Sequence, residues 1–288
     1  MIDPGQHPPA PAPDRPSEIL LDTPDARWRT PSNLRLRMIA SVVMIAVAVL
    51  ALWAGGFAFW LLAVVVSLLM MAEWAGLQKA PARTKRLGQF ALSVPLATMA
   101  PAWLVLETRD FFTLGLVAGA AFFVAIVTRL PKLAAGVLYC GLPVLALVYL
   151  RRQDDGLLYA FWTMALVWAC DIGAFFAGRS IGGPKLAPRL SPNKTWAGLF
   201  GGMVAATILG GLLWALADLP PLLAIATPFL AILAQIGDLF ESMLKRQAGV
   251  KDSGNTLPGH GGVLDRLDGL VPVAPVAAVL VALGVLLS

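Results

Sequence analysis

A glycine-rich stretch near the end of the chain combines residue types that suit phosphate and metal chemistry. Residues 256–270 read TLPGHGGVLDRLDGL and place Asp265 and Asp268 three positions apart, just after Gly261 and Gly262. Magnesium binds a few carboxylates and completes its coordination with substrate phosphate oxygens, while glycines let backbone amides approach a phosphate closely. The pattern therefore predicts a site for a phosphate and a metal ion, although acids at a helix start also serve as caps.

A stripe of polar residues lies just upstream, inside an apolar segment. Its members occupy positions i, i+3, i+4 and i+7, which share one face of a helix: Asp238, Glu241, Ser242 and Lys245. Charged side chains facing lipid are costly, so we expect this stripe to line a wet cavity and Asp238 to approach Asp265. Asp171 lies deep in another apolar run and is a site candidate for the same reason. Glu73, near a segment end, suits a cap, a surface or a site equally well.

A second polar loop, GRSIGGPKLAPRLSPNKTWAG, follows the segment that holds Asp171. Its cations and hydroxyls suit phosphate oxygens: Lys185, Arg189, Lys194, Ser191 and Thr195. Loop topology alone would explain the cations but not the run SPNKT. No Walker-type glycine loop is present.

The histidines and cysteines support no other catalytic arrangement. His260 lies within the glycine-rich stretch, where phosphate contact, loop bracing and acid–base work all remain open. Cys140 and Cys170 fall in apolar runs and are expected to be packing residues. The spacing supports neither a zinc site nor a Ser-His-Asp triad.

These residues are set in a chain whose composition predicts an all-α, polytopic membrane protein. Of its 288 residues, 58% are hydrophobic and only 14% are charged, whereas soluble domains carry about a quarter. We expect about nine transmembrane helices, because apolar runs of about 20 residues can cross a core of about 30 Å. The runs are 37–54, 57–75, 88–106, 112–128, 133–150, 157–178, 195–216, 221–246 and 268–287.

Charge predicts how the helices are oriented. Residues 1–34 are rich in proline and acids and are expected to form a disordered cytoplasmic tail before a membrane domain at 35–288. With that tail inside, all Lys and Arg fall on the cytoplasmic side except Arg109, Arg151 and Arg152. The net charge of +5 is then a feature of cytoplasmic loops, and no nucleic-acid partner is expected.

The residues 242–268, SMLKRQAGVKDSGNTLPGHGGVLDRLD, resemble the signature of the phosphatidate cytidylyltransferases. That pattern is S-x-x-K-R-x(4)-K-D-x(5)-[PG]-x-H-G-G-x-x-D-R-x-D. The preceding GDLFES, the earlier D-x-G-A-x-x-x-G-R and K-L-x-P-x-x-S-P-x-K-T also resemble the family. The resemblance runs from about residue 35 to the end.

The resemblance implies an enzyme that makes CDP-diacylglycerol and pyrophosphate from CTP and phosphatidic acid in the bacterial cytoplasmic (inner) membrane. It implies Mg²⁺, a second monovalent cation such as K⁺, membrane lipid as a partner and a homodimer. The metal ligands would be Asp238, Asp265 and Asp268, and further catalytic candidates are Lys251 and His260. The candidates for substrate binding are Asp171, Lys185, Ser191, Lys194, Thr195, Ser242, Lys245, Arg246, Asp252, Gly261, Gly262 and Arg266.

The chain departs from the family pattern at three positions. Phe175 stands where the family often has Tyr, Asn193 where a basic residue is common, and Ala197 where Glu is usual. We therefore assign no catalytic role to position 197. Three alternatives stay open: a CTP-dependent lipid or polyprenol kinase, an ion-coupled transporter and a catalytically inactive scaffold. A transporter of this kind would show two related halves, and the sequence shows no such repeat.

Overall fold

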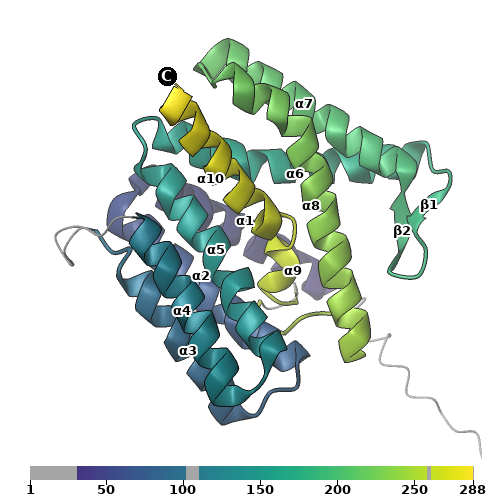
Figure 1. Ribbon diagram of the computed structural model, residues 1–288. Helices are drawn as coiled ribbons and strands as arrows, with labels where there is room; N and C mark the ends of the chain where they lie inside the picture. Colours follow the sequence, from purple (N-terminus) through teal and green to yellow (C-terminus); the bar gives the residue numbers. More distant parts are fainter. Residues whose placement is uncertain (1–30, 102–109, 258–260, 288) are drawn as a thin grey trace, which may run out of the picture.

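The computed structural model describes residues 31–101, 110–257 and 261–287, which fold into ten helices and one small antiparallel sheet (Figure 1). The helices before the sheet are α1 (Pro31–Ala54), α2 (Gly56–Leu77), α3 (Ala82–Ala97), α4 (Asp110–Thr128), α5 (Pro131–Arg152) and α6 (Gly156–Ser180). The sheet pairs β1 (Lys185–Ala187) with β2 (Ser191–Thr195). The remaining helices are α7 (Trp196–Ala217), α8 (Pro221–Ala248), α9 (Leu264–Leu267) and α10 (Leu270–Leu287).

The predicted all-α membrane class is confirmed, and each of the nine apolar runs contains a helix. Five helices are long and apolar enough to cross a membrane: α2, α5, α6, α7 and α8. Shorter apolar stretches lie in α1, α4 and α10. The predicted number of nine transmembrane helices does not match: the described residues form ten helices, of which five are candidate spans, three contain shorter apolar stretches, and α3 and the one-turn α9 are neither. Helix α1 begins at Pro31, inside the range predicted as tail, while residues 1–30 lie outside the described residues.

Helix α5 forms the centre of the packing. It contacts α2, α3, α4, α6 and α10, so it is surrounded on most sides and buries residues around its circumference. Leu133, Val137 and Leu150 are fully buried there. Cys140 on α5 and Cys170 on α6 are free and buried, as the packing interpretation predicted.

Helices α6 and α7 are the most extensively packed helix pair among the described residues and carry the β hairpin to one side of the molecule (Figure 1). A Cβ atom added at Gly173 would lie 2.5 Å from the carbonyl oxygen of Gly201, so the two backbones touch. Small residues allow such approach between membrane helices. The hairpin joins this pair, with Lys185 opposite Thr195, and so places residues of the SPNKT run at one end of the molecule.

Two arginines that broke the predicted charge bias brace helix ends. Arg151 Nε donates to the Leu52 carbonyl at 2.8 Å, in the last turn of α1. Arg152 donates to the carbonyls of Met99 and Ala100, just after α3. Carbonyls at helix C-termini lack intrahelical partners, and cations there are favourable. The two arginines at the end of α5 therefore stabilise the C-terminal end of α1 and the residues that follow α3.

Candidate active site

The polar stripe on α8 forms as predicted, but its members differ in environment. Ser242 Oγ donates to Asp238 at 3.4 Å, and Lys245 Nζ lies 2.7 Å from a Glu241 carboxylate oxygen. Glu241 is fully buried. The expectation that the whole stripe lines a wet cavity is therefore wrong for Glu241, whose carboxylate is buried against the Lys245 ammonium instead of facing water. Asp238, by contrast, keeps 31% of its side chain exposed.

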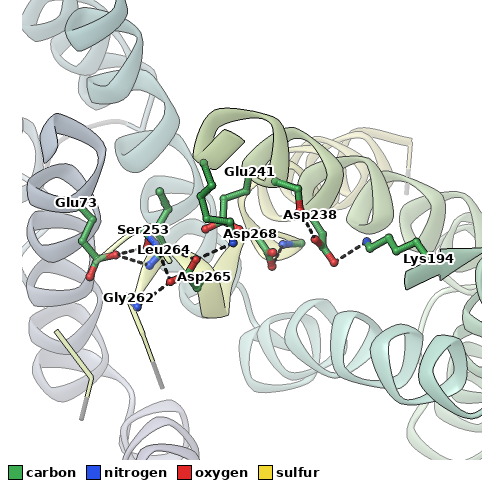
Figure 2. Close-up of polar contacts among 12 residues, drawn as sticks. Glu73, Lys194, Asp238, Glu241, Ser253, Gly262, Leu264, Asp265 and Asp268 are labelled. Carbon is green, nitrogen blue, oxygen red and sulfur yellow. Dashed lines mark hydrogen bonds and ion pairs between the residues drawn. The ribbon is translucent and has the colours of Figure 1, made fainter. Parts of the chain in front are cut away.

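Asp265 is held by donors from two directions (Figure 2). Lys245 Nζ donates to one carboxylate oxygen at 2.8 Å, and the Gly262 amide donates to the other at 2.8 Å. The Ser253 amide is shared between both oxygens at 3.1 and 3.0 Å. Burial alone would raise the pKa of Asp265, but hydrogen bonding, to Lys245 first, then to Glu241 and then to the Gly262 amide, lowers it below its ordinary value. Asp265 is thus ionised and well supplied with protein donors.

Glu73 reaches the same region from α2. Its carboxylate accepts hydrogen bonds from Ser253 Oγ at 3.0 Å and Thr256 Oγ1 at 2.5 Å. It also accepts the amides of Val263 at 2.9 Å and Leu264 at 2.8 Å. We call these residues, together with Lys245, Gly262 and Asp265, the loop anchor. The anchor fixes the segments that join α8 to α9.

Gly261 and Gly262 make this arrangement possible. Gly261 has φ = 84°, a left-handed conformation that favours glycine. A Cβ atom at Gly262 would lie 2.0 Å from Ser253 Oγ and 2.4 Å from Glu73 Oε2. Leu257 donates its amide to the Gly261 carbonyl at 2.9 Å, which pairs the two segments. Backbone conformation at Gly261 and close packing at Gly262 therefore explain why both positions are glycine, even without a bound phosphate.

A second group of charges lies beside the anchor and has few donors. We call Asp171, Lys194, Asp238 and Asp268 the acidic cluster. Lys194 Nζ lies 2.5 Å from an Asp238 oxygen and donates to Gln235 Oε1 at 3.0 Å. Asp268 accepts the amide of its neighbour Gly269 at 2.7 Å. Burial, reinforced by the negative charge of Asp238 and, less strongly, of Asp171, raises the pKa of Asp268 above its ordinary value.

Close packing of α8 brings Asp238 and Asp268 together. A Cβ atom at Gly237 would lie 2.3 Å from the Asp268 carbonyl oxygen. Only glycine permits that approach, and the neighbouring Asp238 is thereby carried toward Asp268, as Figure 2 shows.

The donor set of the acidic cluster fits magnesium when substrate phosphates complete the coordination. Within the three described ranges, no three Asp, Glu, His or Cys side chains lie close enough together to hold a metal ion by themselves. Magnesium commonly uses only one or two protein carboxylates and keeps water or phosphate as its other ligands. Asp238 and Asp268 provide two carboxylates whose mutual repulsion a divalent cation would relieve. The oxygens of Asp265 already accept three protein donors.

The structure separates the other predicted site residues into neighbours of the site and exposed positions. Thr195 is buried, and its hydroxyl accepts the Gly198 amide at 3.0 Å as the N-cap of α7, so it has a structural role that the substrate prediction did not include. Asp252 lies against Gly261. His260 lies outside the described residues. The other exposed candidates are Lys185, Arg246, Lys251 and Arg266, and Ser191 is half-buried. Asp252 and, in the acidic cluster, Asp171 are also exposed.

Sequence reasoning did not assign several residues that the structure places in the site, among them Glu73, Gln235 and Ser253. The sequence leaves Glu73 open among cap, surface and site roles and assigns no role to Gln235 or Ser253. Gln235 is 5% exposed and bridges Lys194 to the Cys170 sulfur. Its amide within an apolar run was a usable signal, because a buried amide needs hydrogen-bond partners. The partners of Glu73 lie 180 or more residues away, beyond any local pattern.

The fold and the site define a multi-pass membrane protein with a polar centre for phosphate-bearing ligands, built from α2, α6, α8, the β2 strand and α9 with the residues that flank it. Residues 35–283 match the model of the cytidylyltransferase family, and the chain belongs to that family. It is 42% identical over 254 residues to the phosphatidate cytidylyltransferase of Brucella suis, covering 84% of this chain and 91% of that protein.

Two relatives from other bacteria match a shorter part of the chain. The phosphatidate cytidylyltransferase of Bacillus subtilis is 45% identical over 150 residues, covering 51% of this chain and 56% of that protein. The protein of the same name from Pseudomonas aeruginosa is 47% identical over 130 residues, covering 44% and 47%.

Proposed function

We propose that this chain transfers the cytidylyl group of CTP to phosphatidic acid, yielding CDP-diacylglycerol and pyrophosphate. The observation that carries the proposal is the acidic cluster, in which Lys194 lies against Asp238 beside the glycine-rich segment, within a membrane bundle of the cytidylyltransferase family. The names of the Brucella and Bacillus relatives support the same activity.

The reaction needs positioning and charge neutralisation more than a protein nucleophile. A phosphate oxygen of phosphatidic acid attacks the α-phosphorus of CTP. The bond from that phosphorus to the oxygen bridging the β-phosphorus breaks, and pyrophosphate leaves with the electron pair. Lys194 is suited to neutralise phosphate charge, since it lies at the cluster with 17% of its side chain exposed. The exposed Arg246, Lys251 and Arg266 are further candidates for phosphate contacts.

We further propose that Asp238 and Asp268 hold Mg²⁺, which would polarise the phosphate oxygens and offset the negative charge of the reacting groups. Asp265, also predicted as a ligand, accepts Lys245, Ser253 and Gly262 in this arrangement, so we infer that it supports the metal site through the loop anchor. A second, monovalent cation such as K⁺ rests on the family resemblance alone.

The proposed reaction also has consequences for the membrane, the orientation and the partners of the protein. We infer a bacterial cytoplasmic membrane with the N-terminus and the site on the cytoplasmic side, where CTP is available. The charge bias of the loops supports that orientation. A homodimer and membrane lipid as a partner rest on the resemblance. The residue Ala197, where the family usually has Glu, lies in the first turn of α7 and receives no role.

One assay tests the activity. Purified protein in detergent is incubated with Mg²⁺, phosphatidic acid and CTP labelled in the base, and lipid is then extracted. We expect label in the organic phase, with one pyrophosphate released for each labelled lipid. Unlabelled lipid together with labelled CDP in the aqueous phase would identify a kinase and refute the proposal. A Lys194→Met variant is expected to raise the KM for CTP about tenfold, by loss of one charge-assisted phosphate contact.

A further inference from the structure

We propose that Glu73 on α2 is a positioning residue for cytidylyl transfer, which holds the segments 250–257 and 261–264 in the geometry that the active site needs. The inference rests on the proposed function for its catalytic readout. Its structural part stands on four hydrogen bonds between α2 and the C-terminal part of the chain.

The four hydrogen bonds use both oxygens of the Glu73 carboxylate. One oxygen accepts the Thr256 hydroxyl and the Val263 amide, and the other accepts the Ser253 hydroxyl and the Leu264 amide. Glu73 is only 5% exposed. A buried carboxylate is costly unless its lone pairs are satisfied, and here all four lone-pair positions receive a donor. Such saturation fixes the position of each donor relative to α2.

The donors require an ionised carboxylate and not simply a polar side chain. A glutamine at position 73 would present one oxygen and one NH₂ group. The hydroxyls of Ser253 and Thr256 can rotate and accept from that NH₂ group, but a backbone amide cannot. Either orientation of glutamine would therefore set its NH₂ against the amide of Val263 or of Leu264. The isosteric substitution should loosen the start of α9 while preserving side-chain volume.

The same segments carry the groups that bind Asp265. Ser253 offers its hydroxyl to Glu73 and its amide to Asp265, so one residue joins the two carboxylates (Figure 2). Gly262 donates to Asp265, and its Cα is packed against Glu73 so tightly that a Cβ would lie 2.4 Å from Oε2. Leu264, capped by Glu73, directly precedes Asp265. Any shift of Glu73 therefore displaces Asp265 and, through the single turn of α9, Asp268.

A matched set of variants tests this role. Glu73→Gln is compared with Ser67→Ala, which removes another buried hydrogen bond of the same helix: Ser67 Oγ donates to the Cys140 carbonyl at 2.9 Å and touches nothing in the site. Thr256→Val is a milder second variant, because Thr256 is exposed and loses only one hydrogen bond to Glu73. Glu73→Asp tests whether a shorter carboxylate restores part of the effect.

Two readouts separate positioning from general damage. The first is hydrogen–deuterium exchange of the intact detergent-solubilised protein, followed for peptides covering 261–267 and, as reference, for peptides of α5. The second is the division of the kinetic effect between kcat and the KM values for CTP and Mg²⁺. Glu73→Gln should speed exchange at 261–267 only and lower kcat about 10–100-fold, as the loss of a supporting partner does in metal sites. Thr256→Val should produce a smaller change of the same kind.

The outcomes are decisive in both directions. Unchanged exchange at 261–267 in Glu73→Gln and Thr256→Val would overturn the proposal, as would equal losses of kcat in Ser67→Ala. If Glu73→Gln does not fold, Thr256→Val carries the test by the same criteria. If the unaltered protein labels no lipid with cytidine, the proposed function fails. Faster exchange confined to 261–267 in Glu73→Gln would even then establish that Glu73 holds this segment.

Discussion

The loop anchor and the acidic cluster are neighbours with similar side chains and opposite electrostatics. In the anchor, the carboxylates of Glu73 and Asp265 accept eight hydrogen-bond contacts, most of them from backbone amides and hydroxyls. In the cluster, Asp238 and Asp268 repel one another and share few donors. A carboxylate whose lone pairs all accept protein donors fixes the positions of the segments that carry those donors. A carboxylate with few donors retains affinity for a cation or substrate. The contrast yields four tests, taken from the largest expected effect downward.

Asp238→Asn should abolish activity without weakening the fold. We expect kcat to fall on the order of 10³-fold, because one carboxylate of the proposed metal site is lost. Thermal stability should change little, because the loss of the ion pair with Lys194 is offset by the removal of repulsion with Asp268. Turnover with base-labelled CTP and a thermal unfolding curve measure both effects. Asp154→Asn, an exposed acid in the connection between α5 and α6, is the control and should behave like the unaltered protein. Turnover within threefold of normal would remove Asp238 from the metal site.

Asp265→Asn should damage activity and stability together. One of the donors Lys245, Ser253 and Gly262 would lose its acceptor, so we expect a stability loss of about 1–3 kcal/mol and a fall in kcat of about 10²-fold. Thermal unfolding and a magnesium titration of activity measure these effects. A full loss of activity with unchanged stability and a raised magnesium requirement would instead make Asp265 a direct ligand, and the two regions would then merge into one.

Gly237→Ala should push apart the backbones that bring the acidic cluster together. Its Cβ would lie 2.3 Å from the Asp268 carbonyl, so α8 must shift. We expect about 1–3 kcal/mol of destabilisation and a tenfold or smaller loss of kcat, roughly following the displacement of Asp238 from Asp268. Gly211→Ala on α7, where a Cβ meets nothing within 4 Å, is the matched helical control and should be neutral or stabilising. Equal behaviour of the two variants would mean that the close contact is unimportant for the site.

Ser242→Ala should have the smallest effect. The hydroxyl donates to Asp238 across 3.4 Å, a long hydrogen bond, so its loss should change kcat by less than about threefold. Steady-state kinetics with CTP as the varied substrate give the comparison. A loss above thirtyfold would show that Ser242 itself contacts substrate or metal, and the acidic cluster would have to be enlarged to include it.

The sequence predicted those features that depend on local pattern. Long apolar runs predicted the membrane helices, and the spacing of Asp238, Glu241, Ser242 and Lys245 predicted their shared face on α8. The signature around Asp265 predicted the family. Each of these is encoded within about 30 residues, where helical period and composition decide the outcome.

The rest depended on contacts between distant segments. Nothing near Glu73 indicates that its partners are Val263 and Leu264, because that pairing is set by how α2 packs beside α9. The burial of Glu241 and the cap role of Thr195 were likewise decided by packing. The sequence predicts a loop where the structure has the hairpin β1–β2, since strands of three and five residues carry little periodic signal.

The sequence separation between Glu73 and its partners also determines when the loop anchor can form during synthesis of the chain. At about 5–20 residues per second, a ribosome needs about 10–40 s to reach Val263 after it has made Glu73, 190 residues earlier. Throughout that interval the nascent chain carries in α2 an acid whose partners have not been translated. The buried carboxylate of α2 therefore receives its four donors only after the segments 250–257 and 261–264 have been made, so the loop anchor forms late relative to the helix that it holds.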